Sequence, residues 1–83
     1  MPEVEVGMVS DFFAQPVVAG IDLSGTVKNG DKIHIEGHTT NIEMTITSME
    51  IDHVHVEKAE KGQSIGIKVP DRVRRGDKVY RVT

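Results

Sequence analysis

Short runs of alternating apolar and polar residues, separated by turn-forming residues, make up most of this chain. Alternation with a period of two is typical of a half-buried strand. It predicts six strands, at residues 4–13, 17–23, 32–36, 42–51, 65–69 and 79–82. Gln15 and Pro16 are expected to end the first strand, because proline lacks the N–H that a sheet needs. No segment has the sustained apolar spacing of an amphipathic helix, so the predicted fold class is all-β.

The fourth of these runs changes phase along its length. Its apolar residues stand at even positions up to Ile46 and at odd positions from Met49 onward. A one-residue shift would turn a regular strand inside out. We therefore expect a β-bulge near Thr47 and Ser48 that bends one long strand around the corner of a barrel.

A repeated turn pattern precedes three of the strands. Residues 27–35 and 73–81 both read as a polar pair, a glycine, an aspartate and then alternating apolar residues, and residues 62–69 are a weaker echo. Glycine adopts positive φ at little cost, so it can complete a tight turn and start a strand. We expect Gly30, Gly62 and Gly76 to play this part.

Six short strands at close spacing indicate a closed barrel, which would leave no exposed sheet edge. Val56 and Ala59 are expected to point inward from an ordered turn. The predicted core otherwise consists of the inward-facing strand residues Val6, Met8, Leu23, Ile33, Ile35, Ile46, Ile65, Ile67 and Val79.

Size and composition narrow the classes of protein. Eighty-three residues with 37% hydrophobic and 28% charged residues fit one globular domain, residues 1–83, which we expect to be monomeric. There is no cysteine, so disulfides and thiolate metal sites are excluded, which is compatible with a cytoplasmic protein. No apolar run reaches the length of about 20 residues that spans a bilayer, and the N-terminus does not resemble a secretory signal.

Positive charge gathers near the C-terminus of an otherwise acidic chain. The net charge is −3, yet residues 68–81 hold six basic residues and only two acidic ones. The cluster either keeps exposed hairpin tips soluble or forms a docking patch for phosphate or an acidic partner. Its candidate binding residues are Arg72, Arg74, Arg75, Lys78 and Arg81.

The residues for common catalytic chemistry are missing. The sequence has no phosphate-binding glycine loop, no nucleophile elbow and no cysteine nucleophile. His53 and His55 would share one face of a strand, but a pair of histidines alone is a weak metal signal. We therefore expect no enzyme activity, no metal and no cofactor.

Two further features are candidates for contact with a partner. Phe12 and Phe13 should point to opposite faces of their strand, so that at most one lies in the core. The other is expected to be buried under a loop, and the alternative is that it stacks or docks on a partner. The polar loop at residues 37–41 contains His38, Thr39 and Thr40, which offer hydrogen bonds without net charge. That loop suits contact with a ribose or a terminal base, and it equally suits a solvated turn.

Five motifs in order resemble the second domain of translational GTPases. They are Val6-Gly7-Met8-Val9, then residues 18–25, the turn at residues 27–31 with Val27 where leucine is usual, residues 48–67 with Gln63 where aspartate is common, and Val73-Arg74-Arg75-Gly76-Asp77. The resemblance covers residues 6–82. The chain looks most like short, free-standing elongation-factor-like proteins, and similar barrels occur at the C-terminus of some collagenase-like peptidases.

The resemblance implies a six-stranded, closed Greek-key barrel and a role in translation. In elongation factor Tu this barrel helps to hold the aminoacyl end of transfer RNA and packs against the GTPase domain. We therefore expect a cytoplasmic, non-catalytic module that binds tRNA, rRNA or the ribosome. The alternative is an adaptor that docks on a protein such as a partner GTPase or peptidase. Arg72, Arg74 and Arg75 favour RNA, whereas the acidity of the chain favours a protein partner.

Overall fold

The computed structural model describes residues 3–14 and 17–82 and confirms the all-β class, since no helix occurs in these residues. The expected strand break at Gln15 and Pro16 lies outside them. The strands are β1 (Glu3–Phe13), β2 (Val18–Leu23), β3 (Val27–Lys28), β4 (Lys32–Glu36), β5 (Asn41–Thr45), β6 (Met49–Ile51), β7 (Val54–Val56), β8 (Lys58–Ala59), β9 (Ser64–Lys68) and β10 (Lys78–Val82).

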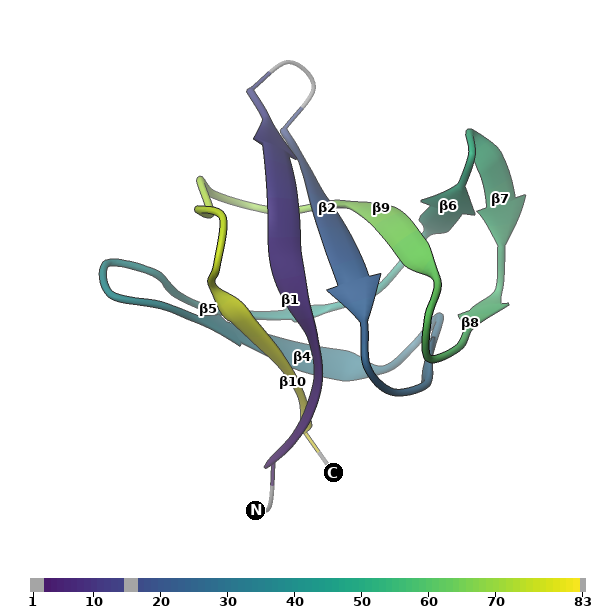
Figure 1. The fold of residues 1–83 in the computed structure, drawn as a ribbon, viewed down its shortest axis with the longest axis horizontal. Coiled ribbons are helices and arrows are strands. Elements are labelled where there is room, and N and C mark those ends of the chain that lie inside the picture. The colour runs from purple at the N-terminus through teal and green to yellow at the C-terminus, as the bar shows by residue number, and fades with distance from the viewer. Residues whose placement is uncertain (1–2, 15–16, 83) are drawn as a thin grey trace.

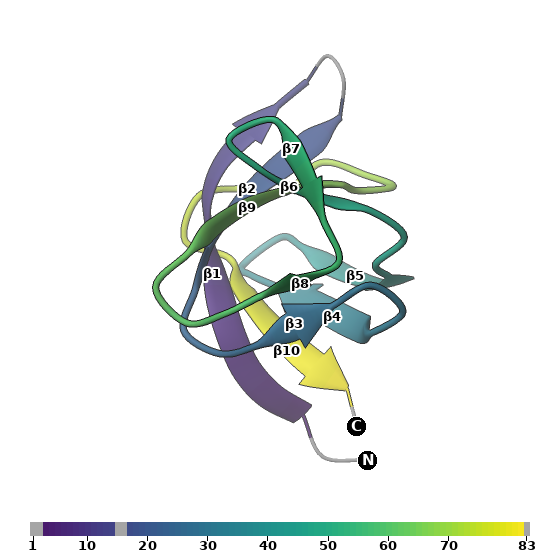
Figure 2. The same ribbon diagram turned by 90° about the vertical axis from the view of Figure 1, so that its right-hand side faces the viewer.

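Eight strands form one antiparallel sheet, and β3 pairs with β8 in a separate two-stranded ribbon (Figures 1 and 2). The order in the large sheet is β5-β4-β10-β1-β2-β9-β6-β7, so β5 and β7 are its two ends. The sheet is curved but not closed into a barrel, and the expected six-stranded closed barrel is therefore not confirmed.

The expected bulge near Thr47 and Ser48 is instead a break between two strands. β5 pairs with β4, whereas β6 pairs with β9 and β7. Between them, the backbone of Ile46 accepts a hydrogen bond from Gly30 N at 2.8 Å and donates one to Asp31 O at 2.9 Å. The phase change in the sequence therefore marks a change of pairing partner, and this break lies where the barrel was expected to continue.

Side chains from most strands meet in one hydrophobic core. It confirms eight of the nine predicted core residues. Val56 and Ala59 also point inward as predicted, but they lie on the strands β7 and β8 and not in the expected turn. Met8 is the error, because its exposed fraction is 45%. The register of β1 with β10 shifts between Glu5 and Gly7, so the inward positions after Val6 are Gly7 and Val9, and Met8 points outward. A β-bulge of this kind reverses the faces of all later residues in a strand.

The three repeated turns have the backbone that the sequence predicts. Gly30, Gly62 and Gly76 have φ of 95°, 91° and 90°, respectively. In each turn the residue after the glycine donates its backbone N–H to the carbonyl three residues earlier, at 3.1 Å. A positive φ at the third of four residues is the mark of a type II turn, which glycine favours strongly.

A side chain closes each turn a second time. Asp31 Oδ2 accepts a hydrogen bond from Lys28 N at 3.0 Å, and Asp77 Oδ2 accepts one from Arg74 N at 2.9 Å. In the third copy, Gln63 Oε1 accepts from Glu60 N at 2.7 Å. An amide oxygen thus replaces the carboxylate oxygen, which explains why glutamine can stand at the position that holds aspartate in the other two turns.

An imidazole ties the N-terminal end of β1 to β4 and β5. His34 Nδ1 lies 2.9 Å from Glu3 Oε2, and its Nε2 lies 2.6 Å from Asn41 Oδ1. Both neighbours are acceptors, so the geometry favours the doubly protonated ring. The hydrogen bond to Asn41 raises the pKa of His34 above its ordinary value of 6.5. Glu3 and the charge of Glu36 also raise it, and burial opposes them.

Replacing Gly76 with alanine should destabilise the fold, because an L-residue at positive φ costs about 1–2 kcal/mol. The matched control is Gly66→Ala in β9, where φ is not positive and an added Cβ would lie 3.6 Å from Val18 Cγ1, an ordinary contact. That control should be neutral or slightly stabilising. Urea unfolding monitored by circular dichroism compares the variants. Equal stability of the two would contradict the role of the turn.

The His34 contacts should make stability depend on pH. Because the folded state holds the proton more tightly, their contribution is fully present below the unfolded pKa of 6.5 and is lost as pH rises through the raised folded pKa. The difference in unfolding free energy between the wild type and His34→Gln should therefore shrink as pH rises through this window. Unfolding in urea across a pH series measures it.

His38→Gln, in the exposed loop after β4, is the control and should keep the pH dependence of the wild type. A stability difference for His34→Gln that is constant with pH would show that the interaction does not depend on the proton.

Candidate functional site

A groove of about 610 Å³ crosses the outer face of the sheet. Burial alternates along β2, where Ala19, Ile21 and Leu23 face the core and the residues between them face outward. The groove lies over these outward positions and over those of β9. Figure 2 shows that β2 and β9 lie beside the β6–β7 hairpin. Its lining residues are Phe13, Val18, Gly20, Glu50, Asp52, His53, Ser64, Ile65 and Gly66.

Two glycines form the floor of this groove. Gly20 of β2 and Gly66 of β9 stand directly opposite each other in the register of the two strands. Neither has a positive φ, and a Cβ at either position would meet its nearest neighbour at 3.4 Å or more. The backbone and the packing therefore do not demand glycine here. Glycine inside a strand often marks a bulge, a bend or a place where a ligand or another chain approaches closely. Gly20 lies opposite the register shift of β1 between Val9 and Asp11, whereas β9 has no register shift at Gly66 in its pairing with β2.

One wall of the groove is apolar. Phe12 packs against the core, whereas the next residue, Phe13, has 52% of its surface exposed and lines the groove. This confirms that the two rings point to opposite faces of β1. Val18 lies beside Phe13, since the two residues pair across β1 and β2. Phe13 is thus the aromatic residue that remains available for contact.

The other side of the groove carries carboxylates. Glu50 lies on β6, opposite Gly66 of β9, and its Oε2 is 3.4 Å from His55 Nε2. Asp52 and His53 form the two-residue turn between β6 and β7, with φ of 51° and 65°. Two positive φ values indicate a type I′ turn, in which aspartate is favoured. No lysine or arginine occurs among the described residues that line this groove.

A smaller hollow of about 140 Å³ continues from the groove. It shares Val18, Glu50 and Gly66 with the groove and adds Lys68. Since Lys68 pairs with Val18 across β9 and β2, its charge lies at the end of β9 that is distant from Ser64. The face is therefore acidic beside the β6–β7 turn and basic near the end of β9.

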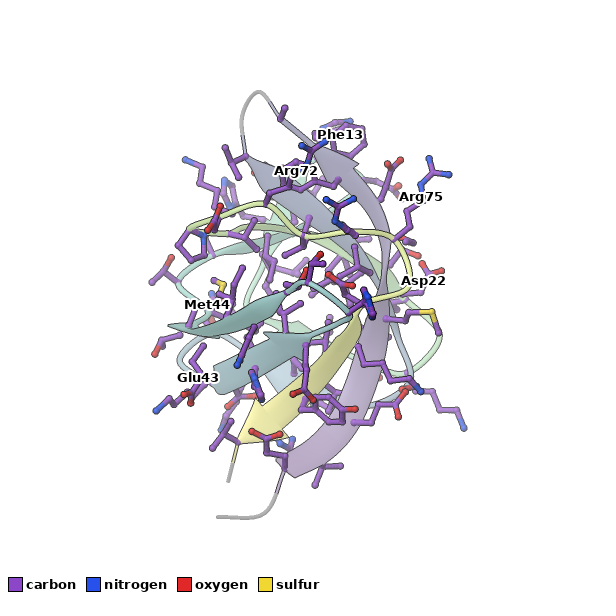
Figure 3. All side chains as sticks on the ribbon, turned by 90° about the vertical axis from the view of Figure 1, so that its left-hand side faces the viewer. Phe13, Asp22, Glu43, Met44, Arg72 and Arg75 are labelled. Atoms are coloured by element: carbon purple, nitrogen blue, oxygen red, sulfur yellow. The ribbon has the colours of Figure 1, made fainter. Side chains whose placement is uncertain are left out.

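The predicted basic residues lie around one end and along one edge of the molecule and mostly have partners. The guanidinium of Arg72 lies 6.0 Å from the centre of the Phe12 ring, and Arg75 Nη2 is 3.5 Å from Asp11 Oδ1. Figure 3 shows Arg72 and Arg75 toward the same end of the molecule as Phe13. On β10, Lys78 Nζ is 3.7 Å from Glu5 Oε1, and Arg81 Nη1 donates to Thr26 O at 3.1 Å.

Val73 is buried and its neighbours Arg72 and Arg74 are exposed, as predicted. The segment before β10 is not a strand, however, and contacts with Glu5, Asp11 and Thr26 partly offset the positive charge. That these basic residues bind a partner stays a prediction.

The loop between β4 and β5 has contacts that support the fold. His38 and Thr39 are exposed, but Thr40 is buried and its carbonyl accepts a hydrogen bond from Gly37 N at 2.8 Å. The buried carboxylate of Asp77 lies against Gly37, so this loop packs on the turn that precedes β10. Contact of His38 and Thr39 with a partner stays a prediction.

The arrangement of metal-binding side chains and the lengths of helices bear on metal binding and membrane insertion. In the part of the chain that the structure describes, no three His, Cys, Asp or Glu side chains are grouped so that they could hold a metal ion. His53 lies in the turn and His55 on β7, so the two do not share one strand. Across residues 3–14 and 17–82, no helix is long and apolar enough to cross a membrane.

Comparison with known proteins shows that the chain is similar to segments of longer proteins. No family model matches it. It is 43% identical over 79 residues to an uncharacterized protease of Methanocaldococcus jannaschii. The aligned region covers 94% of this chain and 19% of that protein. It is 37% identical over 81 residues to a collagenase of Porphyromonas gingivalis strain W83, covering 95% of this chain and 20% of the collagenase. The chain thus spans about a fifth of the length of these relatives.

The fold agrees with a solved peptidase domain. The C-terminal domain of a putative U32 peptidase from Geobacillus thermoleovorans superposes with a TM-score of 0.89 at 15% identity, covering 98% of this chain and 93% of that one. Its selenomethionine variant gives a TM-score of 0.86 over 90% of this chain and 95% of that one. The predicted similarity to a barrel at the end of collagenase-like peptidases is therefore confirmed in its general form.

The predicted role in translation is wrong. The relatives described above are named as a protease, a collagenase and a putative U32 peptidase, not as translation factors. The turn motifs that suggested a translation factor form the glycine turns of this β-fold. The alternative of a module associated with a peptidase agrees better with these relatives.

The sequence named Phe13 and His53 as candidates, but the other groove residues, including the two glycines of its floor, were not identified from it. A usable signal was present, because Gly20 and Gly66 interrupt two apolar alternations at outward positions without any turn chemistry beside them. Recognising that the two glycines face each other requires the pairing of β2 with β9, which the local pattern does not contain.

Replacing Asp77, whose carboxylate closes the turn before β10, should lower the free energy of unfolding more than replacing the exposed Arg74. Asp77→Ala leaves the Arg74 N–H without its acceptor, and a lost partner of this kind costs about 1–3 kcal/mol. Arg74→Ala removes only an exposed side chain, so its effect should stay within about 0.5 kcal/mol. Urea unfolding tests both, and a large loss for Arg74→Ala would show that its side chain supports the fold.

Proposed function

We propose that this chain is a non-catalytic protein-binding module that works with a peptidase or a peptidase-like protein. The observation that carries the proposal is the extent of the similarity: 94% of this chain matches a protease that is about five times longer. A segment of this size within a peptidase supports a unit that binds a protein, while the reaction takes place elsewhere.

The chemistry of the chain supports the non-catalytic part of the proposal. There is no cysteine to act as a nucleophile, and the described residues hold no group that would bind a catalytic metal. The serine whose hydroxyl has a carboxylate partner is Ser64, and it donates to Asp22 Oδ1 at 2.6 Å. No histidine takes part in that bond, so the hydroxyl lacks the base that nucleophilic catalysis needs.

The outer face of the sheet supports the proposal that the chain binds a protein. Pockets of about 300–1,000 Å³ with apolar walls and a few polar groups are typical binding sites. The groove falls in this range and stands on β2 and β9, which are paired on both sides and therefore rigid. Loops are not needed to shape its floor.

A chimera tests this function. In the Porphyromonas gingivalis collagenase, the segment that matches this chain is deleted or replaced by this chain, and hydrolysis of gelatin is measured. We expect the deletion to lose most of the activity through a higher KM, the chimera to recover it, and the isolated chain to hydrolyse nothing. An unrelated β-domain of equal length in the same place is the control and should not restore the activity.

Two results would contradict the proposal. Gelatin hydrolysis by the isolated chain would make it an enzyme. Full activity of a folded collagenase without the segment, or with the unrelated domain, would show that the segment binds nothing that the reaction needs.

A further inference from the structure

We propose that the groove over β2 and β9 binds an extended peptide segment of a partner protein that carries an aromatic residue next to a lysine or an arginine. This inference rests on the proposed function and specifies what its binding surface recognises. It follows from three features of the groove: a flat floor, an apolar wall and an acidic side.

The floor fits a flat ring. At Gly20 and Gly66 no side chain projects from two neighbouring strands, so the exposed backbone forms a level surface between Val18 and Glu50. The backbone groups of β2 and β9 already pair with each other and offer few hydrogen bonds to a ligand. Recognition there depends on shape and apolar contact, and an aromatic ring covers the most area for the fewest lost rotamers.

The wall adds a second apolar contact. Phe13 stands at the end of the floor with about half of its surface exposed, and Val18 separates it from Gly66. Phe13, Val18 and the two glycines line the same groove, so an aromatic ligand that fills it would approach the Phe13 ring. Offset or edge-to-face pairs of aromatic rings add to the binding free energy. The exposed Phe13 would then be covered by the ligand.

The acidic side selects the neighbouring residue. Glu50 and Asp52 approach the floor from β6 and the β6–β7 turn. Lys68 lines the adjoining hollow at the end of β9 that is distant from Ser64, so the carboxylates dominate the charge beside the turn. His55 contacts Glu50 at 3.4 Å from a side chain that is 73% exposed, so a ligand can displace it. A cation next to the aromatic residue would pair with these carboxylates, while an acidic neighbour would be repelled.

A second copy of this chain is a poor occupant. Among the described residues, the aromatic residue followed by a basic one is Tyr80, which precedes Arg81 in β10. β10 is hydrogen-bonded on both sides, to β1 and β4, so this pair cannot enter a groove without unfolding the sheet. The occupant is therefore a segment of another protein.

Blocked peptides of glycine with a central tryptophan–lysine or tryptophan–glutamate pair test the inference. This protein contains no tryptophan, so the indole emission reports only the peptide. We expect the lysine peptide to show a blue shift that saturates with protein concentration and weakens with added salt, and the glutamate peptide to bind several-fold more weakly. Equal binding of the two peptides, or no binding of the lysine peptide, would overturn the inference.

Variants locate the binding. Gly66→Val places a branched side chain on the floor and should abolish the shift, and circular dichroism checks that the sheet persists. Asp52→Asn keeps a residue that tolerates positive φ and should weaken the lysine peptide by up to about fivefold. Glu43→Gln removes a carboxylate on β5, outside the groove, and should leave binding unchanged. Wild-type affinity in a folded Gly66→Val protein would overturn the inference.

The same variant separates this inference from the proposed function. The chimera is prepared with Gly66→Val in the inserted chain. If the chimera with the natural glycine is active and the variant chimera is equally active, the proposed function stands and the groove is not its binding surface. If the natural chimera is itself inactive while folded, the proposed function fails.

Discussion

The fold depends on a turn that is used three times. In each copy a glycine at positive φ, a backbone hydrogen bond and a side-chain oxygen together fix the direction in which the next strand leaves. The strands that follow are β4, β9 and β10. β10 joins β4 to β1, and β9 joins β2 to β6, so two of these turns start strands that hold the sheet together. The groove inherits this rigidity, because β9 is half of its floor.

Features that depend on neighbours in the sequence were predictable, and features that depend on pairing were not. The positive φ of Gly30, Gly62 and Gly76 follows from local turn chemistry, and most of the core follows from alternation. Met8 could not be placed in this way, because the bulge that exposes it exists only in the pairing of β1 with β10. The open sheet also depends on pairing. The apolar run at residues 42–51 divides into β5, which pairs with β4, and β6, which pairs with β9, while Ile46 between them bonds to the turn before β4.

The charges of the candidate site also depend on contacts between segments that are distant in the sequence, which the local pattern does not contain. A count along the sequence found a basic cluster at residues 68–81, but it could not show that Asp11, Glu5 and the Thr26 carbonyl approach three of its cations from other segments. Nor could it show that Glu50 and Asp52 gather beside two glycines from different strands. The split between Phe12 and Phe13 was predictable because it needs only the alternation of one strand.

The groove residues lower the stability of the fold, and this loss is the strongest argument that the groove binds a ligand. Glycine inside a strand destabilises by about 0.5–1 kcal/mol relative to alanine, and the space at Gly20 and Gly66 would admit a Cβ. Phe13 leaves an aromatic surface in water, and Glu50 and Asp52 place two carboxylates beside one hollow. Each feature is unfavourable for an isolated domain. All of them concern one face, and a bound apolar and cationic segment would cover Phe13 and pair with the carboxylates at once.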